Sequence, residues 1–317
     1  LGVRFEARAN EAGAAMLAAA VHYPIRGAVT TKGSVGVSVA SDTLATLAWL
    51  GIVLFGYVAF SAGGFAALFG AISTGVIGPE AVGPETGGGG GIPEELLPPL
   101  VYSTVTAVGY VIPLILGTLL ALRHVEHSTL SVTGEVRHGT LTPTFLAIPS
   151  RARVLAAKVI VMLVAGALLG AVGLVASMGI GGGVLAAFGI DPMFGASDTW
   201  ALAGRAVLAM ALWSAIGVGV GSLIQNQIAA VIVVIAFTQF VEPLLRLAAS
   251  FWEPAAQVGR FLPGAASDAL VGASVYAMFT GASVAPLEWW QGGLVLAGLA
   301  VLVSGIGWAT TWRRDIT

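Results

Sequence analysis

The chain has 317 residues, of which 57% are hydrophobic and only 9% are charged, with a mean hydropathy of +0.92. Ordinary soluble domains carry about 25% charged residues, so this composition excludes a soluble globular domain. It is typical of an all-α polytopic membrane protein. The formal net charge of −2 gives no electrostatic basis for binding nucleic acid, and the absence of cysteine excludes disulfides, thiolate metal sites and cysteine nucleophiles.

Residues 1–43 precede the first long apolar stretch and are predicted to be a cytoplasmic or interfacial segment. The Ala-rich run 12–21 is short for a membrane crossing, and the acidic residues Glu6 and Glu11 precede it, which does not fit a signal peptide. We expect a cytosolic or interfacial helix over about 3–22.

Residues 44–317 are predicted to form one six-span domain. A helix needs about 20 apolar residues to cross the hydrocarbon core, because the core is about 30 Å thick and each residue rises about 1.5 Å. Uncharged stretches of this length occur at about 44–73, 100–122, 159–178, 206–223, 228–247 and 292–312. A further uncharged stretch, Gly179–Ile190, contains three consecutive glycines, and we interpret it as a loop or short surface helix.

Two segments between the predicted spans need a separate interpretation. The glycine-rich segment 74–100 contains no lysine, so it is a flexible linker rather than a phosphate-binding loop, and the chain is not expected to bind ATP by itself. The segment 264–285 carries only one charge, Asp268. A seventh crossing there would move the basic C-terminus to the other side, so we expect re-entrant or surface-lying helices before the last span.

Basic residues indicate which side of the membrane each segment faces. Eleven of the 14 lysines and arginines fall in the N-terminal segment, in the segment 123–158 and at the C-terminus, whereas the segments between them on the opposite side are acidic. Basic loops stay in the cytoplasm. Both termini are therefore predicted to be cytoplasmic, in a multi-pass protein of the plasma membrane.

The segment 123–158 is the most polar part of the chain and is too long for a tight connection. Its mixture of charged and apolar residues suits a short amphipathic helix at the membrane surface that docks on a partner, and a solvated loop is the alternative. Three histidines and an acidic residue in it could suggest a metal site, but they lack a metal-binding spacing, and no metal is expected: His124, Glu126, His127 and His138.

Within the spans, Glu242 and Arg246 lie four residues apart and can pair on one face of a helix. Such a membrane ion pair could act as an outer gate, or it could simply lie at the headgroup level. The motifs at 166–170 and 217–221 are small-residue faces that allow helices to approach closely, within the chain or in self-association. No arrangement of catalytic residues is found in the spans, so we do not expect an enzyme.

Several stretches resemble ABC transporter permeases of the type-2, exporter-like superfamily. The sequence GEVRHGTL at 134–141, followed by AIPSR at 147–151 and then Lys158, is similar to the E-x-R-x-G-T signature and the Pro-x-x-R-like step of that family. GVGVGSLIQNQ at 217–227 and FLPG at 261–264 agree with it, and WRRDI at 312–316 resembles the C-termini of actinobacterial members.

This resemblance implies an assembly of two six-span permease halves and two separate ATP-binding subunits, which would use ATP and Mg. It implies that the segment after span two contains a coupling helix, to which four residues belong by position: Glu135, Arg137, Gly139 and Thr140. Arg137 would dock on the ATPase or form a salt bridge, and Gly139 would form a backbone turn. A homodimer is the simplest assembly, and a hydrophobic or amphipathic drug, lipid or peptide is the expected cargo.

Two other classes compete with this interpretation. A secondary transporter needs no ATPase, but such proteins usually bury several ionisable residues at mid-membrane, often with inverted repeats. Here Glu242 alone qualifies, and we find no convincing repeat. A membrane assembly factor is the third alternative.

Overall fold

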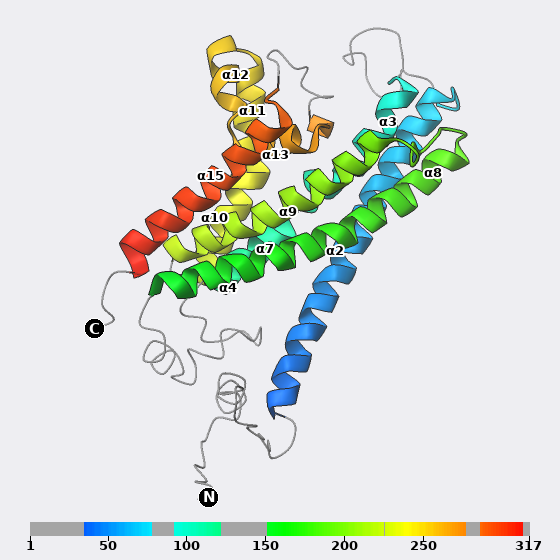
Figure 1. Cartoon of the computed structure of the whole chain (residues 1–317). Coiled ribbons are helices and arrows are strands. Elements are labelled where there is room, and N and C mark those ends of the chain that lie inside the picture. Colours follow the sequence, from blue (N-terminus) through cyan, green and yellow to red (C-terminus); the bar gives the residue numbers. More distant parts are fainter. Residues whose placement is uncertain (1–34, 78–91, 122–150, 225, 277–285, 313–317) are drawn as a thin grey trace, which may run out of the picture.

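The computed structural model describes residues 35–77, 92–121, 151–224, 226–276 and 286–312, and all regular secondary structure in them is helical (Figure 1). Six stretches of helix are long and apolar enough to cross a membrane: Ala48–Ser73, Glu94–Leu119, Leu155–Ala187, Ser197–Leu223, Ile228–Ala249 and Trp289–Thr310. The predicted number of spans is therefore confirmed, and the chain is a multi-pass membrane protein.

Most spans are made of more than one helical element. Span one is α2 (Val35–Ser73), and span four is α9 (Ser197–Leu223). The other four spans are composite. Span two consists of η2 (Glu94–Leu96), α3 (Leu97–Ala107) and α4 (Val111–Ala121), and span three of α7 (Arg151–Ala176), η3 (Ser177–Gly181) and α8 (Gly182–Ala187). Span five consists of α10 (Gln227–Ala236), η4 (Phe237–Val241) and α11 (Glu242–Ser250), and span six of α15 (Trp289–Gly307) and η5 (Trp308–Trp312). The elements η3, η4 and η5 are turns of π-helix.

The third span is longer than the sequence predicts. The interpretation of Gly179–Ile190 as a loop or separate surface helix is wrong, because the helix of span three continues without a break to Ala187. Gly181 and Gly182 are close-packing positions within the helix, whereas Gly189, beyond its end, lies in a turn with a φ of +81°. A side chain at Gly181 would collide with Val101 of α3, and one at Gly182 would meet Phe194.

The second span begins earlier than predicted, at Glu94, and is broken between α3 and α4. Pro113 lies in the first turn of α4 and has no N–H to donate to the carbonyl of Gly109, four residues before it. Gly109 also lacks room for a side chain, because a Cβ there would collide with the carbonyl oxygen of Val105 and approach Leu54. The proline and the tight contact together explain the break.

The helix α9 is the centre of the bundle. In its most apolar window 72% of the residues are buried, compared with 22% for spans five and six. Close contact with α4 is reciprocal, since a Cβ at Gly117 would collide with the Ser214 carbonyl and a Cβ at Gly217 with the Leu114 carbonyl.

The predicted small-residue motifs are used inside the chain. Gly166 and Gly170 of α7 both pack against Met210 of α9, and Gly219 of α9 packs against Ser304 of α15. These glycines therefore bring helices of one chain together, and the contacts that they form leave them unavailable for self-association.

The ends of the helices divide into two groups (Figure 1). The start of α2, the end of α4, the start of α7 and the end of η5 lie at one end of the bundle, and α8, α12 (Glu253–Gly259) and α13 (Pro263–Val271) lie at the other. With seven and nine residues, α12 and α13 are too short to cross a membrane. The helix expected over 3–22 and the coupling segment within 122–150 lie outside the described residues.

Candidate functional site at the end of span five

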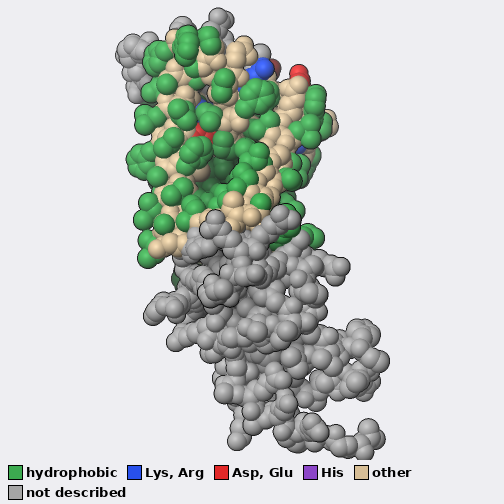
Figure 2. All heavy atoms as spheres, turned by 90° about the vertical axis from the view of Figure 1, so that its left-hand side faces the viewer, with side chains coloured by type: hydrophobic (Ala, Val, Ile, Leu, Met, Phe, Trp, Pro, Cys, Tyr) green, Lys and Arg blue, Asp and Glu red, His purple; other side chains and the backbone are tan. Residues whose placement is uncertain are grey.

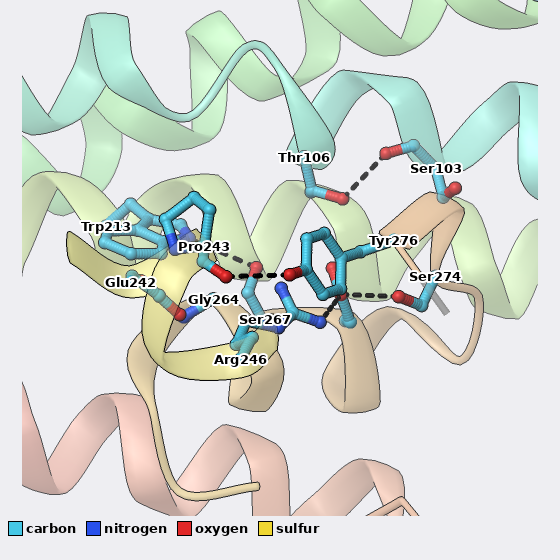
Figure 3. A network of polar contacts seen from close by, with 11 residues as sticks. Ser103, Thr106, Trp213, Glu242, Pro243, Arg246, Gly264, Ser267, Ser274 and Tyr276 are labelled. Atoms are coloured by element: carbon cyan, nitrogen blue, oxygen red, sulfur yellow. Dashed lines mark hydrogen bonds and ion pairs between the residues drawn. The ribbon is translucent and has the colours of Figure 1, made fainter. Parts of the chain in front are cut away.

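A cluster of polar side chains joins the last part of span five to α13, at the end of the bundle that holds α12 (Figures 1 and 3). Glu242 and Arg246 lie one helical turn apart on α11, and Gly264 and Asp268 lie one turn apart on α13. Glu242 contacts Gly264 and Arg246 contacts Asp268, so the two short helices are joined at positions with the same spacing.

Glu242 is the most buried charged side chain of this cluster, with 3% of its surface exposed. Its Oε1 accepts a hydrogen bond from the backbone N–H of Gly264, in the first turn of α13. The first N–H groups of a helix have no partner within the helix, and the helix dipole favours a carboxylate there. Gly264 has no room for a side chain, because a Cβ would collide with the same Oε1.

Arg246 forms its ion pair with Asp268, at 2.6 Å between Nη2 and Oδ2. The expected direct pair between Glu242 and Arg246 is not among the ion pairs of the described residues. The physical reason is the docking of α13, which offers Glu242 a free backbone N–H and offers Arg246 a carboxylate at the same helical spacing. Ser274 donates a hydrogen bond to the same Oδ2 of Asp268, at 2.6 Å.

Tyr276 completes the surroundings of Arg246. The guanidinium carbon of Arg246 lies 4.2 Å from the centre of the Tyr276 ring, a cation–π contact. The hydroxyl of Tyr276 donates to the carbonyl oxygen of Pro243, at 2.8 Å. Burial raises the pKa of the Tyr276 phenol, which keeps it protonated and able to donate.

The π-helical turn η4 has a cause in the sequence. In this turn the N–H of Glu242 pairs with the carbonyl of Phe237, five residues earlier. The next such partner, for the carbonyl of Thr238, would be the N–H of residue 243, but that residue is proline and has none. The hydroxyl of Tyr110 donates to the Thr238 carbonyl instead, at 3.3 Å.

The central helix α9 contributes Trp213, which is 1% exposed. Its Nε1 donates to the hydroxyl oxygen of Ser267 on α13, at 3.1 Å, and its ring lies 4.4 Å from that of Tyr110, measured between centroids. Gln239 donates to the Tyr110 hydroxyl at 3.4 Å. The cluster therefore connects span two, span four, span five and α13.

The side of the bundle formed by α10, α11 and α15 is covered by hydrophobic side chains and hollowed in the middle (Figure 2). Acidic atoms are visible in the depth of the hollow. A second concave surface, a groove of about 450 Å³ between α2 and α7, is lined by apolar residues alone. The hollow in Figure 2 therefore combines apolar walls with charge, and the groove does not.

Of the residues predicted from the sequence as functional, the structure describes two, Glu242 and Arg246. The four predicted coupling residues lie outside the described residues: Glu135, Arg137, Gly139 and Thr140. The described residues contain no group of acidic or histidine side chains that could hold a metal ion.

Sequence reasoning missed Asp268, Tyr276, Tyr110 and Trp213 as members of the cluster. Asp268 is the only charge between residues 264 and 285, and this isolation within an apolar segment was the available signal. The aromatic residues gave no signal, because aromatic side chains are common in apolar helices.

A scan against protein-family models, a search of curated proteins and a search of solved structures found no match to this chain.

Proposed function

We propose that the chain is the membrane-spanning permease subunit of an ATP-driven ABC exporter in the plasma membrane. It moves a hydrophobic or amphipathic substrate, such as a drug, lipid or peptide, by alternating access. Two copies of a separate ATP-binding subunit, which use ATP and Mg, drive it, and a second permease half, an identical copy in the simplest case, completes the pathway.

The observation that carries this proposal is the segment GEVRHGTL at 134–141, placed between spans two and three. The six-helix bundle supports it, because this segment is flanked by the end of α4 and the start of α7, at the end of the bundle where span one begins and span six ends. With the basic segments and both termini in the cytoplasm, an ATPase on that side has access to the coupling segment.

Co-purification tests the proposal. The tagged chain is expressed in its native host and isolated in mild detergent, and the recovered material is examined for an ATP-binding subunit. We expect the ATPase to co-purify, with Glu135→Ala and Arg137→Ala reducing its recovery and Glu126→Ala, an acidic control in the same loop, leaving recovery unchanged. Equal recovery and equal ATPase activity in all variants would remove the coupling role of residues 134–141.

The buried carboxylate of Glu242 favours a second candidate, an ATP-independent secondary transporter, because intramembrane acidic residues commonly serve ion-coupled transport. Transport into sealed vesicles distinguishes the two. Uptake driven by ATP in the presence of the partner subunit supports the exporter, whereas uptake driven by an ion gradient, with the permease alone, supports the secondary transporter. A membrane assembly factor would support neither ATP-driven uptake nor uptake driven by an ion gradient.

A further inference from the structure

The two ends of the short helix α12 expose a group of large apolar side chains. Phe251 and Trp252, between α11 and α12, have 82% and 66% of their surfaces exposed. Val258 and Phe261, at the other end of α12, are also exposed. We call these four residues the α12 patch. Apolar side chains exposed together on one surface indicate that a partner or a membrane covers them.

The α12 patch lies where span five ends. The apolar stretch of span five ends at Ala249, two residues before Phe251. The far end of α12 returns to the same level, because a Cβ at Gly259 would lie 3.1 Å from the Cβ of Ala249. The helix α12 is thus located at the end of the bundle (Figure 1), where the hydrocarbon core gives way to headgroups. Aromatic side chains are enriched at this level of membrane proteins.

Arg260 follows α12 directly and is the only basic residue between Arg246 and Arg313. Its guanidinium carbon lies 5.1 Å from the centre of the Phe261 ring, so its charge is located within the α12 patch. No ion pair or hydrogen bond joins its side chain to another of the described residues. Its Nε is buried without a partner, whereas its two Nη nitrogens are not among the buried atoms, and the residue is partly exposed. A partly desolvated guanidinium of this kind calls for an anion at its accessible end.

A phospholipid supplies both the anion and the apolar surface that the α12 patch lacks. Its phosphate lies just outside the hydrocarbon core, which is the level of Arg260. A guanidinium binds a phosphate through two parallel hydrogen bonds. The acyl chains of the same molecule can cover the apolar side chains, which a free phosphate cannot do. Phospholipids also surround every span at this level, so no further partner is required.

We propose that Arg260 and the α12 patch bind a phospholipid of the leaflet at this end of the bundle. The Nη nitrogens of Arg260 hold the phosphate, and the aromatic side chains contact the upper part of the acyl chains. The bound lipid then fixes the end of span five at the headgroup level. This inference goes beyond the proposed function and does not rest on it, because it requires only this chain and a membrane.

Native mass spectrometry of the delipidated full chain in dodecyl maltoside tests this inference. Dioleoylphosphatidylglycerol is titrated into the protein, and dioleoylglycerol, which has the same acyl chains but no phosphate, is the matched lipid. Inorganic phosphate is added as the free form of the anion. We expect the phospholipid to bind about tenfold more tightly than dioleoylglycerol, because charge-assisted hydrogen bonds to the phosphate add to the apolar contact. Inorganic phosphate should not displace it.

Three variants assign the binding to Arg260. Arg260→Gln removes the charge, and its affinity for the phospholipid should fall about tenfold. Arg260→Lys keeps the charge but not the paired hydrogen bonds, so a loss of about threefold is expected from a variant whose Tm is unchanged. Arg205→Gln, near the start of α9, is the control. Arg205 is also partly exposed, but its Nε already donates to the Ala201 carbonyl, so its replacement should leave the affinity unchanged.

Equal binding of the two lipids would overturn the inference, because the α12 patch would then hold acyl chains without contacting the phosphate. Displacement by inorganic phosphate would replace the lipid with a free anion. Equal affinity of Arg260→Gln and the unsubstituted protein, or an equal loss in Arg205→Gln, would also overturn the assignment. In the same spectra, a dimer that is lost in Arg260→Gln would show that a second copy of the chain covers the α12 patch instead.

Discussion

Arg246 and Asp268 form a 2.6 Å ion pair although 22 residues separate them in the chain. The pair joins α11, at the end of span five, to the short helix α13, and about one sixth of each side chain remains exposed. It is therefore screened less than a surface pair and desolvated less than a fully buried one. The pair is one of several contacts that hold α13, together with the hydrogen bonds of Gly264 to Glu242 and of Trp213 to Ser267. The first prediction concerns it.

Asp268→Asn is expected to destabilise the protein by about 1–3 kcal/mol, between the values for exposed and for buried pairs. The substitution keeps the shape of the side chain but leaves Arg246 without its counter-charge. Thermal unfolding in detergent, followed by the fluorescence of a thiol-independent dye, measures the change in Tm. The double variant Arg246→Gln with Asp268→Asn should lose less stability than the two single variants lose in sum. Strict additivity of the losses would show that the pair contributes no coupling energy.

Gly264→Ala is expected to destabilise by about 1–3 kcal/mol, because the new methyl group would overlap the carboxylate of Glu242. Combining it with Glu242→Asp, which withdraws the carboxylate by one methylene group, should restore part of the loss. Gly204→Ala in α9 is the control, since a Cβ there meets no atom. A loss equal to that of the control would contradict the close contact between Glu242 and Gly264.

Gly217→Ala should separate α9 from α4, because the added Cβ would collide with the carbonyl oxygen of Leu114. Overpacking at backbone contacts costs about 1–3 kcal/mol or more, and the central position of α9 makes this contact important for the whole bundle. The measurement is the yield of monodisperse protein on size-exclusion chromatography together with Tm. Gly298→Ala in α15, where a Cβ would meet no atom, should match the unsubstituted protein.

The absence of cysteine makes the chain suitable for mapping its topology. Single cysteines at position 88, in the glycine-rich segment, and at position 128, in the basic segment, are tested in intact cells with a membrane-impermeant maleimide. We expect labelling at 88 and none at 128 until the cells are opened, because basic segments stay in the cytoplasm. Labelling at 128 in intact cells would place the coupling segment outside and refute the proposed function.

The sequence determined the number of spans, because the length of an uncharged apolar stretch must match the thickness of the membrane. It also identified Glu242 and Arg246 as charges inside a span, since their cost in an apolar environment makes them conspicuous. These inferences depend on residue types and spacing within one helix, and they hold before any helix finds its neighbour.

Only the tertiary structure decided the partners of these residues and the roles of the glycines. Helical spacing indicated that Glu242 and Arg246 can pair, whereas in the structure α13 supplies Gly264 as the partner of Glu242 and Asp268 as the partner of Arg246. The glycines at 181–183 favoured a loop or short surface helix, but the absence of a side chain also permits close packing of helices, and Val101 packs against Gly181. Contacts of this kind arise between segments that are distant in the chain, so no local pattern encodes them, and the docking of whole helices selects one arrangement.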